Sequence, residues 1–336
     1  MIPLQTASGH PVTHIAFSPD GATVAVAQPF FGVTLLERAT GRTVGFCPLP
    51  CRAALADLVF CGGGRSLAVS SPKGVEVFDV ATGTSVGRVL RGFYKNARLA
   101  NRGGTLIGGG YVAGVRALWA PVVGREPSDL HARAAEIGGV EALSADGRFA
   151  LLSGAGSCTL LFDLVAGRTV ASVERHATIE RNQRPPVHRF CPLGRRFALN
   201  SGRTLDVYDV GGLGDTGEQY PDTPLLQREF LSHYEIEHGA VVAPAPHAVL
   251  DSAFTLTPDK PEPGGWYPPY ALLADGRGVL VKRPRNRVQL WDAPTGTLVN
   301  EWSWRLEWVT CVAASADGQT AVAGGRFGRV LLWDLD

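Results

Sequence analysis

Three features of the sequence predict an all-β protein that folds as a β-propeller of four-stranded antiparallel blades. Short runs of alternating apolar and polar residues are separated by tight-turn sequences, as in hairpins of half-buried strands. One turn phrase recurs with a fixed offset to the strands around it. The 336 residues also exceed the usual single core of roughly 100–200 residues, so either several domains or one ring of repeats is expected. A composition with 45% apolar residues, 41 Gly and 23 Pro favours the ring of short strands and many turns.

The clearest repeat opens the chain and predicts four antiparallel strands. The turn Ser18-Pro19-Asp20-Gly21 separates the first two strands, and Ala39-Thr40-Gly41 separates the last two. The expected strands cover residues 12–17, 23–27, 33–36 and 43–47.

The same turn phrase returns later in the chain with uniform spacing. The last apolar residue of the third strand stands 16 positions after the turn Asp in four copies: Asp20 to Leu36, Asp146 to Phe162, Asp275 to Trp291 and Asp317 to Trp333. Degenerate copies with one residue more or less run from Gly63 to Phe78, Arg102 to Trp119 and Leu193 to Tyr208. The repeats therefore predict seven blades.

The third strands end in an aromatic residue followed by Asp in five units: Phe78-Asp79, Phe162-Asp163, Tyr208-Asp209, Trp291-Asp292 and Trp333-Asp334. With this ending spread over nearly the whole chain, the sequence resembles the WD-repeat family of β-propellers. The Gly-His pair that the family places before its first strand occurs once, as Gly9-His10, so the resemblance implies a divergent member without the His-based hydrogen-bond network in most blades. With this resemblance we interpret the chain as a bacterial member of the family. The excess of 28 Arg over four Lys fits a GC-rich genome as well as selection, and it decides nothing about function.

The two ends of the sequence are expected to complete one blade. The last unit stops after its third strand, and residues 2–7 stand where a fourth strand is missing. We therefore predict that this N-terminal segment pairs with the strand over residues 330–333 and closes the ring, because an open ring would expose unpaired strand edges.

One interval between successive turns is about twice as long as the others, 82 residues from Leu193 to Asp275. Residues 213–266 inside it form either a long acidic insertion or a degenerate extra blade, so seven blades are expected and eight stay open. Nine acidic and two basic residues give the interval 211–268 a charge of −7, which leaves +8 on the rest of the chain. This separation of charge has two explanations: it orients a charged partner, or the acidic segment is a solvated loop.

Chain reversal at each turn places the turns between second and third strands, and the connections between blades, on the same side of the disc. We name this side the connection face. Basic residues are expected to gather there, from the sixth unit (Lys282, Arg283, Arg285 and Arg287) and from the connection between the fourth and fifth units (Arg181 and Arg184).

Aromatic residues are expected on the same face. Trp304 and Arg305 lie in the last connection, and Trp266 and Tyr267 lie at the end of the acidic segment. Because Trp, Tyr and Arg are frequent interface anchors, we predict a protein or peptide site formed by Arg181, Arg184, Trp266, Tyr267, Lys282, Arg283, Arg285, Arg287, Trp304 and Arg305. We expect Trp302 and Trp308 to wedge between blades, whereas burial and exposure stay open for Trp304 and Trp266.

Motifs typical of enzymes occur in an unsuitable context. Gly83-Thr84-Ser85-Val86-Gly87 matches a nucleophile elbow and Gly108-Gly109-Gly110 resembles a dinucleotide loop, but both motifs require a helix where a strand is expected. The cluster from His233 to His238 is better explained as an acidic surface strand than as a metal site. The six cysteines are expected to be reduced structural thiols.

The sequence therefore predicts a noncatalytic interaction scaffold without cofactor or metal, and a propeller enzyme with a central-channel active site is the alternative. A net charge of +1 provides no field that would draw the whole molecule to nucleic acid or a membrane. The N-terminus lacks the features of a signal peptide, and no stretch approaches the ~18 apolar residues of a membrane span. We expect a cytoplasmic protein, monomeric on its own, that binds a protein or peptide.

Overall fold

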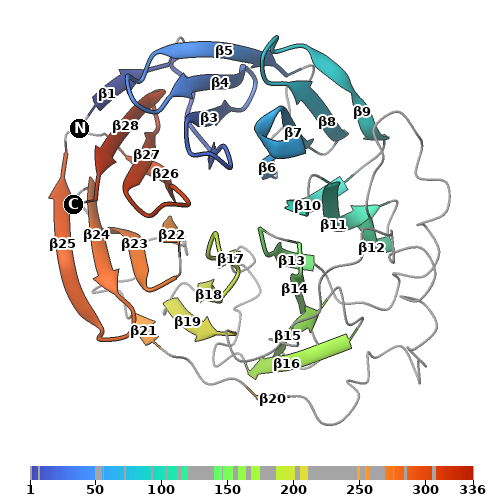
Figure 1. Cartoon of the computed structure of the whole chain (residues 1–336), viewed down its shortest axis with the longest axis vertical. Coiled ribbons are helices and arrows are strands. Elements are labelled where there is room, and N and C mark those ends of the chain that lie inside the picture. The colour runs from blue at the N-terminus through green and yellow to red at the C-terminus, as the bar shows by residue number, and fades with distance from the viewer. Residues whose placement is uncertain are drawn as a thin grey trace.

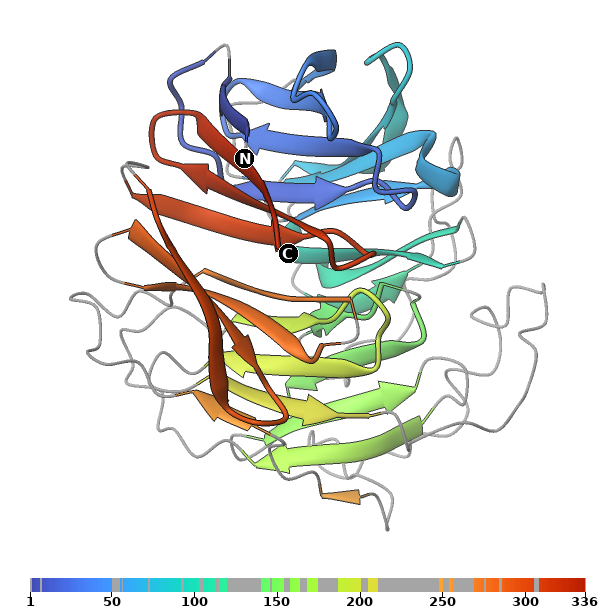
Figure 2. The same cartoon turned by 60° about the vertical axis from the view of Figure 1, so that its left-hand side comes forward.

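The computed structural model shows an all-β propeller with four-stranded antiparallel blades, which confirms the predicted fold class (Figures 1 and 2). The residues that the structure describes are 2–6, 8–49, 55, 57–71, 73–91, 94–102, 105–112, 115–119, 140–145, 147–153, 158–163, 168–174, 187–200, 205–210, 248–249, 254–256, 269–274, 276–283, 286–304 and 308–335.

The sheets stand around a common axis and are numbered here in chain order (Figure 1). The first sheet contains β2 (His14–Phe17), β3 (Thr23–Gln28), β4 (Gly32–Glu37) and β5 (Thr43–Pro48). The second contains β6 (Asp57–Cys61), the short 3-10 helix η1 (Gly62–Gly64), β7 (Ser66–Ser71), β8 (Gly74–Asp79) and β9 (Ser85–Arg91). The third contains β10 (Tyr94–Arg102), β11 (Thr105–Val112) and β12 (Val115–Trp119).

The remaining sheets follow the same order from the axis outward. The fourth contains β13 (Val140–Leu143), β14 (Phe149–Ser153), β15 (Cys158–Asp163), β16 (Arg168–Glu174) and, on its outer edge, β20 (Ala248–Val249). The fifth contains β17 (Val187–Phe190), β18 (Arg196–Asn200), β19 (Leu205–Asp209) and β21 (Phe254–Leu256). The sixth contains β22 (Tyr270–Leu272), β23 (Gly278–Arg283), β24 (Arg287–Asp292) and β25 (Thr297–Ser303). The seventh contains β26 (Val309–Ala314), β27 (Thr320–Gly325), β28 (Arg329–Asp334) and β1 (Ile2–Gln5).

Six of these sheets have at least four strands and are complete blades, whereas the sequence predicts seven or eight. The third sheet contains three described strands, and residues 120–139 after β12 lie outside the described part of the chain. Its inner strand β10 contacts β6 on one side and β13 on the other, so the sheet occupies a place between two complete blades.

The two described strands of the acidic segment 213–266 join neighbouring sheets. β20 pairs in parallel with β16, where Ala248 is opposite Ala171, and β21 pairs antiparallel with β19, where Phe254 is opposite Val207. The other residues of this segment, including His233 and His238, lie outside the described residues.

The N-terminal segment pairs with the last strand, as the sequence predicts. β1 runs antiparallel to β28, with Ile2 opposite Leu332 and Leu4 opposite Val330. Beyond β1, the amide of Thr6 donates a hydrogen bond to the carbonyl of Gly328 over 3.0 Å. Residues from both ends of the chain therefore share the seventh sheet.

Side-chain alternation gives the first, fifth, sixth and seventh sheets two buried faces, each packed against a neighbouring sheet. Along β3, Val24 and Val26 pack against the seventh sheet, and Ala25 and Ala27 pack against the second. A strand with residues this apolar on both faces is typical of the interior of a multi-sheet fold. The core is therefore a series of layers between sheets, and each layer requires two sheets.

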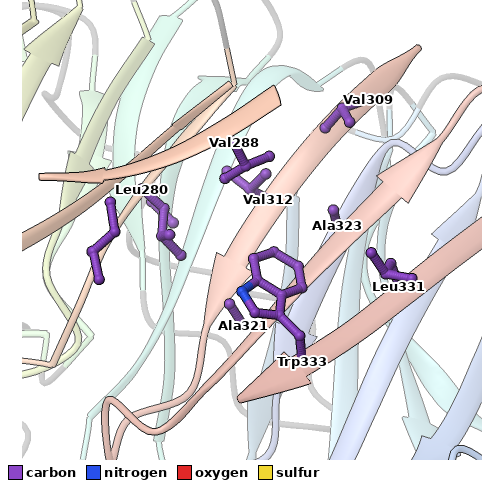
Figure 3. Packing of buried hydrophobic residues seen from close by; sticks show 10 residues of the cluster. Leu280, Val288, Val309, Val312, Ala321, Ala323, Leu331 and Trp333 are labelled. Atoms are coloured by element: carbon purple, nitrogen blue, oxygen red, sulfur yellow. The ribbon is translucent and has the colours of Figure 1, made fainter. Parts of the chain in front are cut away.

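Figure 3 shows one such layer, between the sixth and seventh sheets. Leu280 and Val288 come from the sixth sheet, while Val312, Leu331 and Trp333 come from the seventh. The alternate residues Val330 and Leu332 of β28 pack instead on the first sheet. A single strand thus links two layers of the core.

The recurrent Ser-x-Asp-Gly phrase forms a hydrogen-bonded turn after the inner strand. In the seventh sheet, the hydroxyl of Ser315 donates to Asp317 and accepts the amide of Thr320 over 3.0 Å. Asp317 also accepts the amide of Gln319 over 3.0 Å, and Gly318 has a φ of +71°, which a residue with a side chain rarely adopts. Ser18, Asp20 and Gly21 repeat this pattern in the first sheet.

The Asp after the aromatic residue of the third strand stabilises the turn between the third and fourth strands of the blade. Asp79 accepts hydrogen bonds from the amide and the hydroxyl of Thr82 over 2.8 and 2.9 Å. Asp292 makes the same pair of contacts with Thr295. The aromatic-Asp ending therefore has a structural explanation in these two blades.

The five described cysteines are free thiols, as the sequence predicts, and all but Cys158 are buried. Burial raises the pKa of Cys47 and of Cys61 to about 11 and that of Cys311 to about 12. These thiols therefore stay protonated at neutral pH and behave as small apolar side chains.

Removal of residues 1–8 is expected to lower the thermal unfolding midpoint by several degrees, because it deletes β1 and leaves the edge of β28 unpaired. Differential scanning calorimetry of the truncated and full-length proteins measures this shift. An unchanged midpoint would contradict the stabilising role of β1.

Asp317→Asn is expected to destabilise the fold by about 0.5–1 kcal/mol at neutral pH, because it weakens the partly exposed contact of 2.6 Å between Arg38 Nη1 and Asp317 Oδ2. The hydrogen bond from Arg38, followed by that from Ser315, lowers the pKa of Asp317 to about 2 from its ordinary 3.8. The contribution is therefore complete above about pH 4 and is lost as the pH falls toward 2. Urea unfolding at both pH values measures it, and a loss of equal size at pH 2 and pH 7 would contradict the assignment.

Candidate functional site

Four of the ten predicted contact residues lie within the described part of the chain: Lys282, Arg283, Arg287 and Trp304. The other six lie outside it, namely Arg181, Arg184, Trp266, Tyr267, Arg285 and Arg305.

Lys282 and Arg283 end β23, and both are buried, which corrects the expectation that they are exposed on the connection face. Arg283 donates from Nε to Gln289 Oε1 over 2.7 Å, and its guanidinium carbon lies 5.8 Å from the centre of the Trp291 ring. The guanidinium is thus held within the sixth sheet, because its hydrogen bond and its ring contact are both with the neighbouring strand β24.

Arg287 lies on the surface of the same sheet and is half-buried. Its Nη1 lies 3.1 Å from both carboxylate oxygens of Glu301. The side-chain hydrogen bond from Gln289, followed by that from Arg287, lowers the pKa of Glu301. A hydrogen-bond network within one blade therefore links Arg283, Gln289, Glu301 and Arg287. The guanidinium of Arg287 is engaged by the Glu301 carboxylate in this network.

Trp304 packs against the layer between the sixth and seventh sheets. Its ring centre lies 4.5 Å from that of Trp333 and 6.3 Å from that of Trp302. Trp302 also contacts Trp333, at 5.7 Å, so it wedges between sheets as expected. Trp304 is partly buried by these rings and contributes to the core.

Trp308 is 54% exposed, so the expectation that it wedges between blades is wrong. Its backbone has a φ of +59°, and its amide donates to Asn286 Oδ1 over 3.0 Å. Its carbonyl accepts the amide of Arg326 over 3.2 Å. The backbone is held from both sides while the ring points away from the core.

The turn between β27 and β28 provides a second exposed aromatic residue. Phe327 is 49% exposed, and Arg326 stands between it and Trp308. The guanidinium carbon of Arg326 lies 5.6 Å from the Trp308 ring centre and 5.9 Å from the Phe327 ring centre. One cation is therefore shared by two exposed rings.

The turn between β3 and β4 provides a third exposed aromatic residue, Phe30, which is 57% exposed and has a φ of +70°. Residues 6–10, which follow β1, form hydrogen bonds with residues next to this turn and with the turn that contains Phe327. Gln28 donates from Nε2 to the carbonyls of Ser8 and His10 over 3.1 and 2.6 Å, and Thr6 donates from Oγ1 to the carbonyl of Gly328 over 2.9 Å.

We name Phe30, Trp308, Arg326 and Phe327 the aromatic patch. Phe30 and Phe327 lie in turns between second and third strands, and Trp308 lies in a connection between sheets, so all belong to the connection face. Among the described residues, most of the other exposed large apolar side chains lie on outer strands: Val44, Phe46, Val86, Leu298 and Val299. The patch is distinct because it combines aromatic rings, a cation and turn backbone.

Comparisons with known proteins agree with this architecture. Residues 1–28 match the family model described as "WD40: WD domain, G-beta repeat". The β-propeller domain of Cps50 (Swd1) from Myceliophteria thermophila superposes with a TM-score of 0.67 at 16% sequence identity, over 100% of both chains. No curated protein matches the sequence. At this identity the structural likeness shows the fold, a β-propeller.

Two further findings concern the predicted absences. Within the described residues, no group of three or more His, Cys, Asp or Glu side chains is placed to hold a metal ion. The same part of the chain contains no helix with the length and apolar character needed to cross a bilayer.

Sequence reasoning missed three patch residues, Phe30, Arg326 and Phe327, and misplaced Trp308. A usable signal was present, since Phe30-Phe31-Gly32 and Arg326-Phe327-Gly328 put large apolar residues at turns, where polar residues are usual.

Trp304→Ala is expected to lower the free energy of unfolding by about 2–3 kcal/mol, because it removes ring contacts with Trp302 and Trp333. Trp308→Ala is expected to change it by less than about 0.5 kcal/mol, because that ring is exposed. Urea unfolding followed by circular dichroism compares the two variants. Equal losses would contradict the division into a core residue and a surface residue.

Proposed function

We propose that the protein is a noncatalytic interaction scaffold that binds a protein or peptide partner through the aromatic patch on its connection face. The exposure of Trp308 and Phe327 around the Arg326 cation carries this proposal, and Phe30 is exposed in another turn of the same face. Trp and Arg are enriched among the residues that dominate binding energy, and contiguous exposed apolar groups mark interaction sites.

The backbone at the patch supports a functional reading. Phe30 and Trp308 adopt positive φ values of 70° and 59°, a conformation that costs a bulky residue about 1–3 kcal/mol. A Gly or Asn at these positions would avoid that cost, and neither ring is buried in return. Contact with a partner gives these two side chains a role that burial in the fold does not.

The proposed scaffold is a single propeller over residues 1–336, with seven blades closed by β1. The contacts of β10 with β6 and β13 support the third sheet as the seventh blade of this count. The contacts of β26 with β22 and β2, together with the pairing of β1, support closure.

We interpret residues 213–266 as an insertion rather than an eighth blade, because its described strands β20 and β21 extend the fourth and fifth sheets. Six predicted contact residues stay a prediction in this proposal: Arg181, Arg184, Trp266, Tyr267, Arg285 and Arg305. Cytoplasmic location, a monomeric state and bacterial origin are likewise predictions that follow from the sequence.

Affinity capture from cells of the source organism, with quantitative mass spectrometry, tests the patch. A variant with Trp308→Ala and Phe327→Ala should recover a specific partner at least about tenfold less well than the wild type, since hot-spot truncations cost about 2 kcal/mol or more. The matched control carries Leu298→Ala and Val299→Ala, which removes exposed apolar side chains from the outer strand β25 instead.

Partner recovery that falls with the patch variant and persists with the control supports the proposal. Equal recovery by the wild type and both variants would contradict it.

A further inference from the structure

Arg326 is the cation of the aromatic patch, and no described residue neutralises its charge. It is exposed in the turn between β27 and β28, with its guanidinium carbon 5.6 Å from the centre of the Trp308 ring and 5.9 Å from that of the Phe327 ring. In the part of the chain that the structure describes, this guanidinium forms no ion pair, whereas those of Arg196 and Arg287 each pair with a carboxylate. The charge of Arg326 is therefore available to a partner.

The surroundings of Arg326 are also free of acidic residues. Four segments, joined by hydrogen bonds, lie at the connection-face end of the junction between the first and seventh sheets: residues 8–12, 28–32, 308–310 and 324–329. Together they contain two Arg and no Asp or Glu. Residues 305–307 before Trp308 add one Arg and one Glu, hence no net charge, and lie outside the described residues. A positive surface of this kind attracts an acidic partner.

The contacts of Arg326 favour a carboxylate as the group that it binds. Two ring contacts restrict the side chain, and its backbone amide donates to the Trp308 carbonyl over 3.2 Å. A guanidinium held in this way loses little freedom when it pairs with both oxygens of a carboxylate. Phosphate groups on peptides are usually bound by clusters of Arg, whereas here two rings flank a single guanidinium.

The exposed rings decide what accompanies the carboxylate. An ion pair at an exposed site contributes little binding energy by itself, so most of the energy has to come from apolar contact. Trp308 is 54% exposed and Phe327 is 49% exposed, one on each side of the cation. The surface therefore fits an acidic residue with an apolar residue next to it in the sequence of the partner.

We propose that the partner binds the aromatic patch through an acidic peptide segment, in which an Asp or Glu carboxylate pairs with Arg326 and adjacent apolar side chains contact Trp308 and Phe327. This inference rests on the proposed function, because it names the chemistry of the partner at the same patch.

Peptide arrays probed with the full-length protein test the chemistry. Each array holds short peptides with capped ends and all pairs of apolar residues around a central position, which is Glu in one array and Gln, Lys or phosphoserine in the others. The Glu array should bind most strongly, and by fluorescence polarisation its best peptide should bind at least about fivefold more tightly than the matched Gln peptide. Absence of binding to every array would overturn the proposal, as would stronger binding to any of the other three.

A double-mutant cycle assigns the carboxylate to Arg326. Arg326→Gln should weaken the best Glu peptide by about fivefold or more and should remove the difference between the Glu and Gln peptides. Trp308→Ala should weaken both peptides, because it removes the apolar contact. Arg195→Gln, at an exposed position in a turn of the fifth sheet, is the matched control and should bind as the wild type does. A Glu-to-Gln difference that persists in Arg326→Gln contradicts the assignment.

Failure of this inference can be told apart from failure of the proposed function. If partner recovery falls with the Trp308→Ala and Phe327→Ala variant but is unchanged by Arg326→Gln, the acidic segment is excluded and the aromatic patch is retained. If neither variant changes recovery, the patch itself is excluded.

Discussion

A strand at the edge of a sheet leaves one row of backbone N–H and C=O groups unpaired, and the pairing of β1 with β28 satisfies that row in the seventh sheet. The same pairing brings Ile2 and Leu4 onto the layer between the first and seventh sheets, beside Val12, Val24 and Leu332. The first, fifth, sixth and seventh sheets have buried apolar side chains on both faces, so each of them requires a neighbour on each side. Loss of one pairing would thus expose part of a core layer as well as an edge.

The candidate binding surface depends on this seam between the first and last sheets. Residues 6–10 follow β1 and contact both turns. Thr6 donates to the carbonyl of Gly328, beside Phe327. The carbonyls of Ser8 and His10 accept from Gln28, which lies two residues before Phe30. Gly328 allows this approach, because a Cβ there would lie 2.2 Å from the carbonyl oxygen of Ser8. The seam therefore links the turn of the first sheet that contains Phe30 to the turn of the seventh sheet that contains Phe327.

The repeat pattern predicted the fold well because its signals are local. Apolar alternation, the Ser-x-Asp-Gly turns and the aromatic-Asp endings each specify a hairpin within a few residues, and the structure contains those hydrogen bonds. The site was predicted less well because exposure depends on contacts between distant segments. Arg283 was expected to be a surface cation, but Gln289 and Trp291 hold it within the sixth sheet. Trp308 was expected to lie in the core, but its ring is exposed. Asn286 and Arg326 bind its backbone instead. No local pattern predicts that His188 lies against Glu141 of another sheet.

Native-state hydrogen exchange of the full-length protein tests most directly whether β1 is an integral part of the propeller. If it is, the hydrogen-bonded amides of β1 should exchange with an opening free energy within about 1 kcal/mol of that of the inner strands, as expected for one cooperative unit. Exchange of β1 amides by local fraying, at an opening free energy several kcal/mol lower than that of β26 and β27, would contradict the account.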